Sequence, residues 1–121
     1  MAAILLVEDE AALRMLILDT LEDEGYAIDT ACDGEEALAL LATKPYDLVI
    51  LDNMMPKMSG IDLIERYRAL PAQRAAKTLM LSAKSQRSDQ EMAYRAGADA
   101  FMSKPFSPLE LIARVEAMLH G

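Results

Sequence analysis

The sequence contains few of the residues that mark a disulfide-bonded, zinc-binding or membrane-spanning protein. Cys32 is its only cysteine, so no internal disulfide can form and no cysteine cluster can bind zinc. No apolar run reaches the roughly 18 residues that span a bilayer. Glu8, Asp9 and Glu10 interrupt the first apolar segment, which therefore does not resemble a secretory signal. We expect a cytoplasmic protein with no membrane segment, and Cys32 as a small buried or half-buried residue.

Basic residues are scarce in the first two thirds of the chain. The net charge is −8, and residues 1–83 contain 15 acidic against 7 basic side chains, whereas residues 84–121 contain five of each. Proteins that bind nucleic acid normally present a basic face to the phosphates, so direct binding of nucleic acid is not expected. The acidic part of the chain would instead attract cations.

The chain of 121 residues is long enough for one core and too short for two ordinary domains, so residues 1–121 are predicted to form one domain that acts alone. Short apolar runs of strand length alternate with segments whose apolar residues recur every three or four positions. The runs cover residues 2–7, 27–31, 48–51, 78–81 and 100–103. The second run alternates like an edge strand. This order predicts an α/β fold with a parallel sheet of five strands and helices on both faces.

Capping signals predict where two of the helices begin. Ser107 and Glu110 suit a capping box at the start of the last helix, with a proline at its first position. Ser88 with Glu91 suggests a second capping box, for a helix that ends at Gly97.

Other signals concern helix ends and connections. Pro71 is predicted to stop the third helix, and residues 71–77 to form a surface connection. His120 lies in the last turn of the final helix and is interpreted as a solvated helix end, not as a ligand.

Polar side chains follow four of the predicted strands at their carboxyl ends. Glu8 and Asp9 follow the first strand, Asp52 the third, Ser82 the fourth and Lys104 the fifth. In an open parallel sheet these ends lie at one edge, and ligands bind there where the strand order reverses. We therefore expect these side chains to converge in one cleft.

The expected cleft combines three carboxylates with an ammonium group and a hydroxyl. Crowded carboxylates raise one another's pKa values unless a cation neutralises them, and Mg²⁺ prefers such oxygen ligands. Lys104 adds a compact positive charge, and the hydroxyl of Ser82 can donate a hydrogen bond to an oxyanion. The set suits phosphoryl transfer, in which Asp52 is the candidate nucleophile and would form an acyl phosphate.

The chain resembles, essentially from end to end, the receiver domain of two-component response regulators. The matching segments are "LLVEDE" with Glu8 and Asp9, "LDNMMPKMSG" with Asp52, "LSA" with Ser82, and "GADAFMSKPF" with Phe101 and Lys104. Any one of them is a weak signal, but the ordered set is specific. The resemblance implies the flavodoxin-like (βα)5 receiver fold with strand order 2-1-3-4-5.

The resemblance implies a role for each residue of the cleft. Asp52 would accept a phosphoryl group from a phosphohistidine on a sensor histidine kinase or a histidine phosphotransfer protein. Asp9, Asp52 and the backbone carbonyl of Met54 would bind Mg²⁺, and Glu8 would act through a bound water. Lys104 would pair with the phosphoryl oxygens.

A conformational switch is implied as well. Ser82 would swing toward the phosphoryl group, and Phe101 would change from an exposed to a buried rotamer. These changes would reshape the surface of the fourth helix, fifth strand and fifth helix, which a downstream protein reads. Phosphorylation could also drive homodimerisation through residues 84–121. Such a domain is a signalling protein that catalyses only its own phosphorylation and dephosphorylation.

Three residues beside the expected site raise separate questions. Asn53 follows the nucleophile at a position where apolar residues are frequent in the family, and the sequence offers no explanation of its packing. Met54 and Lys84 each lie two residues beyond a site residue, Asp52 and Ser82 respectively. We expect them at the mouth of the site, where they would tune hydrolysis of the acyl phosphate.

Other functions remain open at this point. A receiver-like domain could signal by constitutive protein binding. A phosphatase with an aspartyl-phosphate intermediate would need an Asp-x-Asp signature, but Asn53 and Met54 follow Asp52. A flavin-binding domain would need a phosphate loop after the first strand, where Glu8 and Asp9 would repel phosphate. The phosphorylation-dependent switch is preferred because it uses every residue of the predicted cleft.

Overall fold

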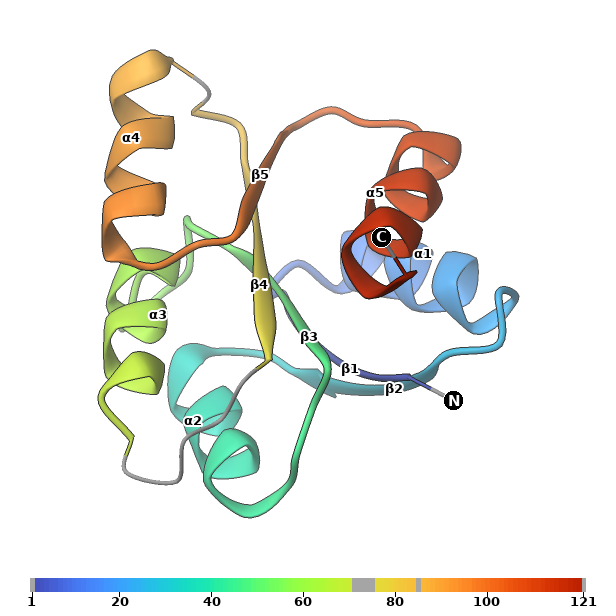
Figure 1. Cartoon of the computed structure of the whole chain (residues 1–121), viewed down its shortest axis with the longest axis horizontal. Helices are drawn as coiled ribbons and strands as arrows, with labels where there is room; N and C mark the ends of the chain where they lie inside the picture. The colour runs from blue at the N-terminus through green and yellow to red at the C-terminus, as the bar shows by residue number, and fades with distance from the viewer. Residues whose placement is uncertain (1, 71–75, 85, 121) are drawn as a thin grey trace.

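The computed structural model describes residues 2–70, 76–84 and 86–120, and it shows strands alternating with helices along the chain (Figure 1). The order is β1 (Ala3–Val7), α1 (Ala11–Glu22), β2 (Ala27–Ala31), α2 (Gly34–Thr43), β3 (Leu48–Asp52), α3 (Gly60–Arg68), β4 (Lys77–Ser82), α4 (Arg87–Ala96), β5 (Ala100–Ser103) and α5 (Pro108–His120). Asp52 and Ser82 are the last residues of their strands, one position beyond the predicted ends. No helix within the described residues is long and apolar enough to cross a bilayer.

The five strands form one parallel sheet in the order β2-β1-β3-β4-β5, as the resemblance implied. β2 is an edge strand, as predicted, but its side chains do not alternate in burial: Ala27 is exposed, the next three are half-buried, and only Ala31 is buried. The strand order reverses between β1 and β3, whose carboxyl ends lie next to each other. Ligands of open α/β sheets bind at such a position.

Helices cover both faces of the sheet, with α1 and α5 on one face and α2, α3 and α4 on the other (Figure 1). Successive residues of a strand point to opposite faces. Thus Ile4 and Leu6 of β1 pack in the core beneath α1 and α5, whereas Leu5 and Val7 pack in the core beneath the other three helices. Because both faces are covered, the inner strands appear in the sequence as uninterrupted apolar runs.

The predicted cap of α5 is confirmed. Ser107 Oγ accepts a hydrogen bond from the backbone N–H of Glu110, and Glu110 Oε1 accepts one from the N–H of Ser107, both at 3.1 Å. Two N–H groups near the start of the helix are thereby satisfied within the capping box.

The predicted cap of α4 is wrong by two residues. Gln86 precedes the helix in an extended conformation, and its backbone N–H donates to Asp89 Oδ2 at 3.2 Å. Ser88 therefore lies inside the first turn of α4. Glu91 instead forms an ion pair with Arg87, one turn before it, with 3.4 Å between Oε1 and Nε. Gly97 follows the helix as predicted, with φ +120°, which glycine adopts without a steric penalty.

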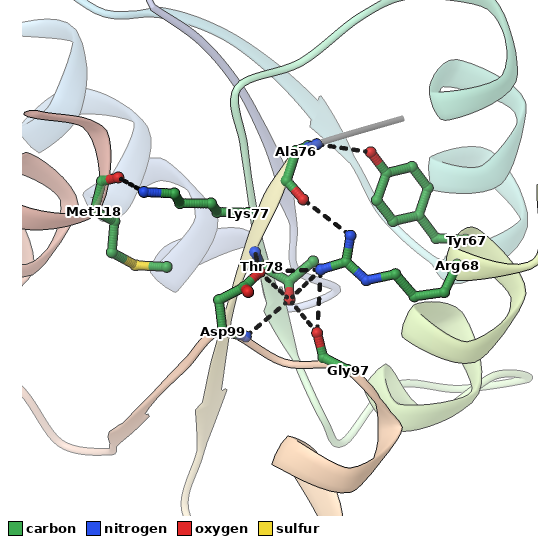
Figure 2. A network of polar contacts seen from close by, with 8 residues as sticks. All are labelled: Tyr67, Arg68, Ala76, Lys77, Thr78, Gly97, Asp99 and Met118. Atoms are coloured by element: carbon green, nitrogen blue, oxygen red, sulfur yellow. Dashed lines mark hydrogen bonds and ion pairs between the residues drawn. The ribbon is translucent and has the colours of Figure 1, made fainter. Parts of the chain in front are cut away.

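The C-terminal turn of α5 makes two contacts with other elements. His120 is exposed, as expected, and its ring stacks on that of Tyr26 with a centroid distance of 6.4 Å. Lys77 Nζ donates to the backbone carbonyl of Met118 at 2.7 Å (Figure 2). A cation at this end satisfies a terminal carbonyl and interacts favourably with the helix dipole.

The expectation that Cys32 is buried or half-buried was wrong, and the expectation for residues 71–77 falls mostly outside the described residues. Cys32 is exposed, because it lies just beyond the buried end of β2 in the turn that leads to α2. α3 ends at Arg68, but Pro71 and most of the predicted connection 71–77 lie outside the described residues. Of that connection, Ala76 is buried.

A polar network connects α3, β4 and the α4–β5 turn at the amino edge of the sheet (Figure 2). Arg68 donates to the carbonyl of Ala76 at 3.1 Å, to the carbonyl of Gly97 at 3.1 Å, and to Asp99 Oδ2 at 3.0 Å. The same Asp99 oxygen accepts the backbone N–H of Thr78 at 2.8 Å. The charges at this edge are therefore paired with each other and with the backbone.

Candidate functional site

The carboxyl ends of β1 and β3 bring three carboxylates together. Glu8 and Asp9 follow β1 directly, and Asp52 ends the neighbouring strand β3. One oxygen from each carboxylate lies within 4.8 Å of the others. Glu8 and Asp52 are 1% and 5% exposed, whereas Asp9 is exposed, so this acidic group is accessible from the side of Asp9.

Lys104 joins the acidic group from the end of β5. Its Nζ lies 2.8 Å from Asp52 Oδ2 and 3.5 Å from Glu8 Oε1. Its backbone N–H donates to the carbonyl of Ser82 at 2.9 Å, and the bond to Pro105 is cis. Burial disfavours the charged ammonium, but the hydrogen bond to Asp52 and the nearby negative charges outweigh burial and raise the pKa of Lys104. The ammonium group therefore remains charged in the site.

Burial makes the negative charge of Glu8 costly to maintain. Burial raises its pKa to about 7 against the opposing effect of the Glu10 N–H, which donates to Oε2 at 3.1 Å, and the charge of Asp52 adds to the rise. Arg14 donates to the backbone carbonyl of Glu8 at 2.8 Å rather than to its carboxylate. A cation bound between the three acids would favour the ionised form of all of them.

The two oxygens of Asp52 have different partners. Oδ2 accepts the hydrogen bond from Lys104, and Oδ1 accepts the backbone N–H of Met54 at 3.1 Å. The second bond closes a local turn of the kind that aspartate side chains often form. It places the backbone of Met54 beside the acidic group, while the Met54 side chain is 53% exposed at the surface.

Ser82 ends β4, and Lys84 follows it in the segment that leads to α4. Ser82 is buried at the end of β4, the strand that pairs with the end of β3. Its Oγ accepts the backbone N–H of Lys84 at 3.0 Å, and the Lys84 side chain is exposed. The serine hydroxyl therefore contacts the first residues of the segment that leads from β4 to α4.

The ring of Phe101 differs from the expected starting position. It is 8% exposed and belongs to the core beneath α2, α3 and α4, which contains the small side chains of Ala93 and Ala98. The expected exposed rotamer is therefore not the one in the structure.

Asn53, for which the sequence offered no explanation, connects the end of β3 to the start of α3. Its Oδ1 accepts the backbone N–H of Ile61 at 3.2 Å, and its carbonyl accepts the N–H of Gly60 at 3.0 Å. Its own N–H donates to the carbonyl of Leu81 at 3.1 Å. A sequence search for helix caps considers the residue next to the helix, here Ser59, and so overlooks a cap eight positions before its donor.

An apolar groove adjoins the acidic group on the side of Lys104. Its volume is about 440 Å³, and its lining comes from α1, the β4–α4 segment and the β5–α5 loop. The lining residues are Leu13, Leu16, Ala83, Lys104, Pro105 and Phe106. Another protein that reaches Asp52 from this side would therefore meet an apolar surface beside the charged site.

Comparison with known proteins identifies similar domains. The family model described as "Response regulator receiver domain" matches residues 4–116. The chain is 44% identical over 116 residues to the transcriptional regulatory protein ResD of Bacillus subtilis, and equally to the phosphate regulon transcriptional regulatory protein PhoB of Rhizobium meliloti. Each alignment covers 96% of this chain but only 47% and 51% of those proteins, so the chain spans about half the length of these relatives.

Solved structures with the same architecture include whole chains of similar size. The chemotaxis response regulator CheY4 of Vibrio cholerae superposes with a TM-score of 0.93 at 32% identity, covering 98% of this chain and 99% of that one. The receiver domain of the Francisella response regulator 1452 gives a TM-score of 0.91 at 31% identity, covering 98% and 97%. Both the fold and the extent of the chain thus match those of receiver domains.

Proposed function

This chain belongs to the response regulator receiver domain family, and on that premise we propose that it is a phosphorylation-dependent signalling switch in which Asp52 accepts the phosphoryl group. The observation that carries the proposal is the environment of Asp52. It is 5% exposed, ends an inner strand, and lies between two other acids and the Lys104 ammonium at 2.8 Å. A carboxylate in such a position can serve as a nucleophile.

The acidic group is suited to Mg²⁺. Three carboxylate oxygens within 4.8 Å of one another are hard donors, and Mg²⁺ is commonly held by one or two carboxylates while keeping waters that a phosphate can displace. We assign Asp9, Asp52 and the backbone carbonyl of Met54 as direct ligands, and Glu8 as a ligand through a water. The bound ion would neutralise the acids and the incoming phosphoryl oxygens.

The phosphodonor in this proposal is a phosphohistidine of a sensor histidine kinase or a histidine phosphotransfer protein. A carboxylate oxygen of Asp52 attacks phosphorus, the P–N bond of the phosphoimidazole breaks, and its electron pair returns to the ring nitrogen. Lys104, whose raised pKa keeps it charged, pairs with the phosphoryl oxygens. Hydrolysis reverses the state: water attacks phosphorus, the acyl P–O bond breaks, and Asp52 is restored with release of inorganic phosphate.

The signal would be read on the face formed by α4, β5 and α5. The Ser82 hydroxyl, which now accepts the N–H of Lys84, would turn toward the phosphoryl group and change the β4–α4 segment. α4 can respond because Ala93 is its one fully buried residue among those described, whereas Met92 is 54% exposed and available to a downstream protein. The phosphoryl group thus shifts a population between two conformations that it contacts differently.

Partner binding is proposed on two surfaces. The apolar groove beside Lys104 adjoins Asp52 and would receive the phosphodonor. The face of α4, β5 and α5 would bind the target or, in the phosphorylated state, residues 84–121 of a second copy. Size-exclusion chromatography with light scattering would detect that dimer as a doubling of mass on phosphorylation.

Intact mass spectrometry tests the proposed chemistry. The protein is incubated with Mg²⁺ and acetyl phosphate, with and without excess EDTA. Wild type should gain one phosphate only when Mg²⁺ is present, and Asp52→Asn should gain none. Asp23→Asn is the matched control, because Asp23 is an exposed aspartate just beyond α1, and it should behave like wild type. A wild type without an adduct, or an equal adduct on Asp52→Asn, contradicts the proposal and favours constitutive binding.

A further inference from the structure

Asn53 lies between the proposed phosphoacceptor and the residue whose carbonyl is proposed to bind Mg²⁺. We propose that Asn53 is a positioning residue that fixes this backbone for Mg²⁺, an inference that rests on the proposed metal site. Its backbone N–H and carbonyl and its side-chain Oδ1 all have partners, and they belong to two elements: Leu81 of β4, and Gly60 and Ile61 of α3. The peptide groups next to Asp52 are thereby fixed from two directions.

The start of α3 lies directly against the end of β3. The first N–H groups of a helix lack partners within the helix and need acceptors from outside it. Ser59 Oγ accepts the N–H of Asp62 at 3.1 Å, while Asn53 accepts those of Gly60 and Ile61. Ser59 is the N-cap residue next to the helix. The acceptors on Asn53 instead belong to the residue that directly follows Asp52 at the end of β3.

Steric contact strengthens this connection. A Cβ placed on Gly60 would lie 2.7 Å from the carbonyl oxygen of Asp52 and 2.8 Å from Cα of Asn53, closer than Cβ atoms approach backbone atoms in proteins. The absence of a side chain on Gly60 therefore allows the helix to approach closely enough for both Asn53 acceptors to be used.

The loop between Asn53 and α3 is held in a conformation that needs anchoring. Lys57 has φ +69°, a region that residues with a Cβ rarely adopt and that costs free energy. The N–H of Met58 donates to the carbonyl of Pro56 at 2.7 Å within the same loop. Firm attachment at both ends limits the alternative conformations that would relieve the strain at Lys57.

The consequence concerns the carbonyl of Met54, which adjoins the anchored residue. If Oδ1 of Asn53 is removed, the peptide groups of Asn53 and Met54 lose one of their anchors to α3. A smaller fraction of molecules then holds the carbonyl in the orientation that Mg²⁺ requires. The apparent dissociation constant rises in inverse proportion to that fraction.

Calorimetric titration with MgCl₂ tests this role in the unphosphorylated protein, using Asn53→Leu and Ser59→Ala. Leucine is close to asparagine in size and has no acceptor, whereas Ser59→Ala removes the other side-chain cap of the same helix without touching the strand end. The Kd for Mg²⁺ should rise by more than twofold in Asn53→Leu, up to a limit of about tenfold that the free energy of one cap sets. It should change less than twofold in Ser59→Ala, although both variants should unfold at lower urea concentrations than wild type.

Each outcome decides between positioning and simple capping. A Kd within twofold of wild type in Asn53→Leu, or an equal rise in Ser59→Ala, overturns the inference and leaves Asn53 as a helix cap. Asn53→Ala replaces the leucine variant if the latter does not fold. If wild type itself binds no Mg²⁺, the proposed metal site is wrong and the role of Asn53 with it. If wild type binds Mg²⁺ and Asn53→Leu binds it with the same Kd, the metal site stands and only the role of Asn53 is refuted.

Discussion

Replacing Gly60 with alanine tests how α3 is seated on the end of β3. The new Cβ would lie 2.7 Å from the Asp52 carbonyl oxygen, 2.8 Å from Cα of Asn53 and 2.9 Å from Sδ of Met80. Two of these three atoms are backbone atoms, one in the last residue of the inner strand β3 and the other in the residue that follows it. β3 pairs with neighbours on both sides, so these atoms cannot move away easily. The helix must retreat instead, and the hydrogen bond from the N–H of Gly60 to Asn53 must lengthen.

The expected cost follows from these contacts. Overpacking of a well-packed core typically costs about 1–3 kcal/mol, and a weakened hydrogen bond adds roughly 1 kcal/mol. The higher helix propensity of alanine returns at most about 1 kcal/mol. We therefore expect Gly60→Ala to lower the free energy of unfolding by about 1–3 kcal/mol, which is large against the roughly 5–15 kcal/mol of a typical domain.

Gly34 provides a matched control, because it is the buried first residue of α2 as Gly60 is of α3. The three atoms nearest to its added Cβ all belong to the side chain of Met58: Sδ at 2.6 Å, Cβ at 3.0 Å and Cγ at 3.1 Å. Sδ and Cγ of a thioether side chain can move away in another rotamer, and only Cβ is fixed to the backbone, so Gly34→Ala should cost less than Gly60→Ala.

Urea unfolding followed by circular dichroism measures both glycine variants. The midpoint of Gly60→Ala should fall clearly below that of Gly34→Ala at an unchanged m-value. If Gly60→Ala lies within about 0.5 kcal/mol of wild type, or if Gly34→Ala is the less stable of the two, the close seating of α3 on Asp52 and Asn53 is incorrect.

Three further predictions concern other parts of the molecule. Met54→Ala and Lys84→Ala should change the half-life of the acyl phosphate on Asp52, followed by intact mass during decay; unchanged half-lives would exclude both side chains as modulators of hydrolysis. Arg68→Met should lower the free energy of unfolding by about 1–2 kcal/mol yet leave the yield of phosphorylation unchanged, because its network lies at the opposite edge of the sheet. A loss of phosphorylation would show that the two edges are coupled. Ser107→Ala should lower the free energy of unfolding by about 1 kcal/mol, because the capping box of α5 is lost. A urea midpoint equal to that of wild type would show that this cap contributes no net stability.

The strand positions could be predicted because their signal is local. An inner strand of a parallel sheet is apolar on both faces, so the runs at 48–51 and 78–81 stand out whatever their neighbours are. The cap of α4 was harder, since Gln86 and Ser88 lie two positions apart and each is followed three residues later by an acid, Asp89 or Glu91. The observed choice depends on where the segment from β4 enters the helix, which local sequence does not specify.

The convergence of the acidic group could be predicted because topology alone brings it about. Once the strands are parallel, Glu8, Asp52 and Lys104 must come to the same edge. The hydrogen bond from Ile61 to Asn53 could not be predicted in this way, because it depends on the path of the intervening loop. The buried ring of Phe101 depends likewise on three-dimensional packing, since most of the residues that share its core come from other strands and helices.

The balance of charge separates the functional edge of the sheet from the structural edge. At the amino edge, Asp99 pairs with Arg68 at 3.0 Å, and its other contacts are with the backbone and hydroxyl of Thr78. At the carboxyl edge, three carboxylates share Lys104, which among the described residues is the only Lys or Arg with its charge within 4.0 Å of any of them. Charges that are already neutralised stabilise a fold but have little affinity for a further ion. The uncompensated negative charge lies at the other end of the strands, where a divalent cation and then a phosphoryl group can complete the balance.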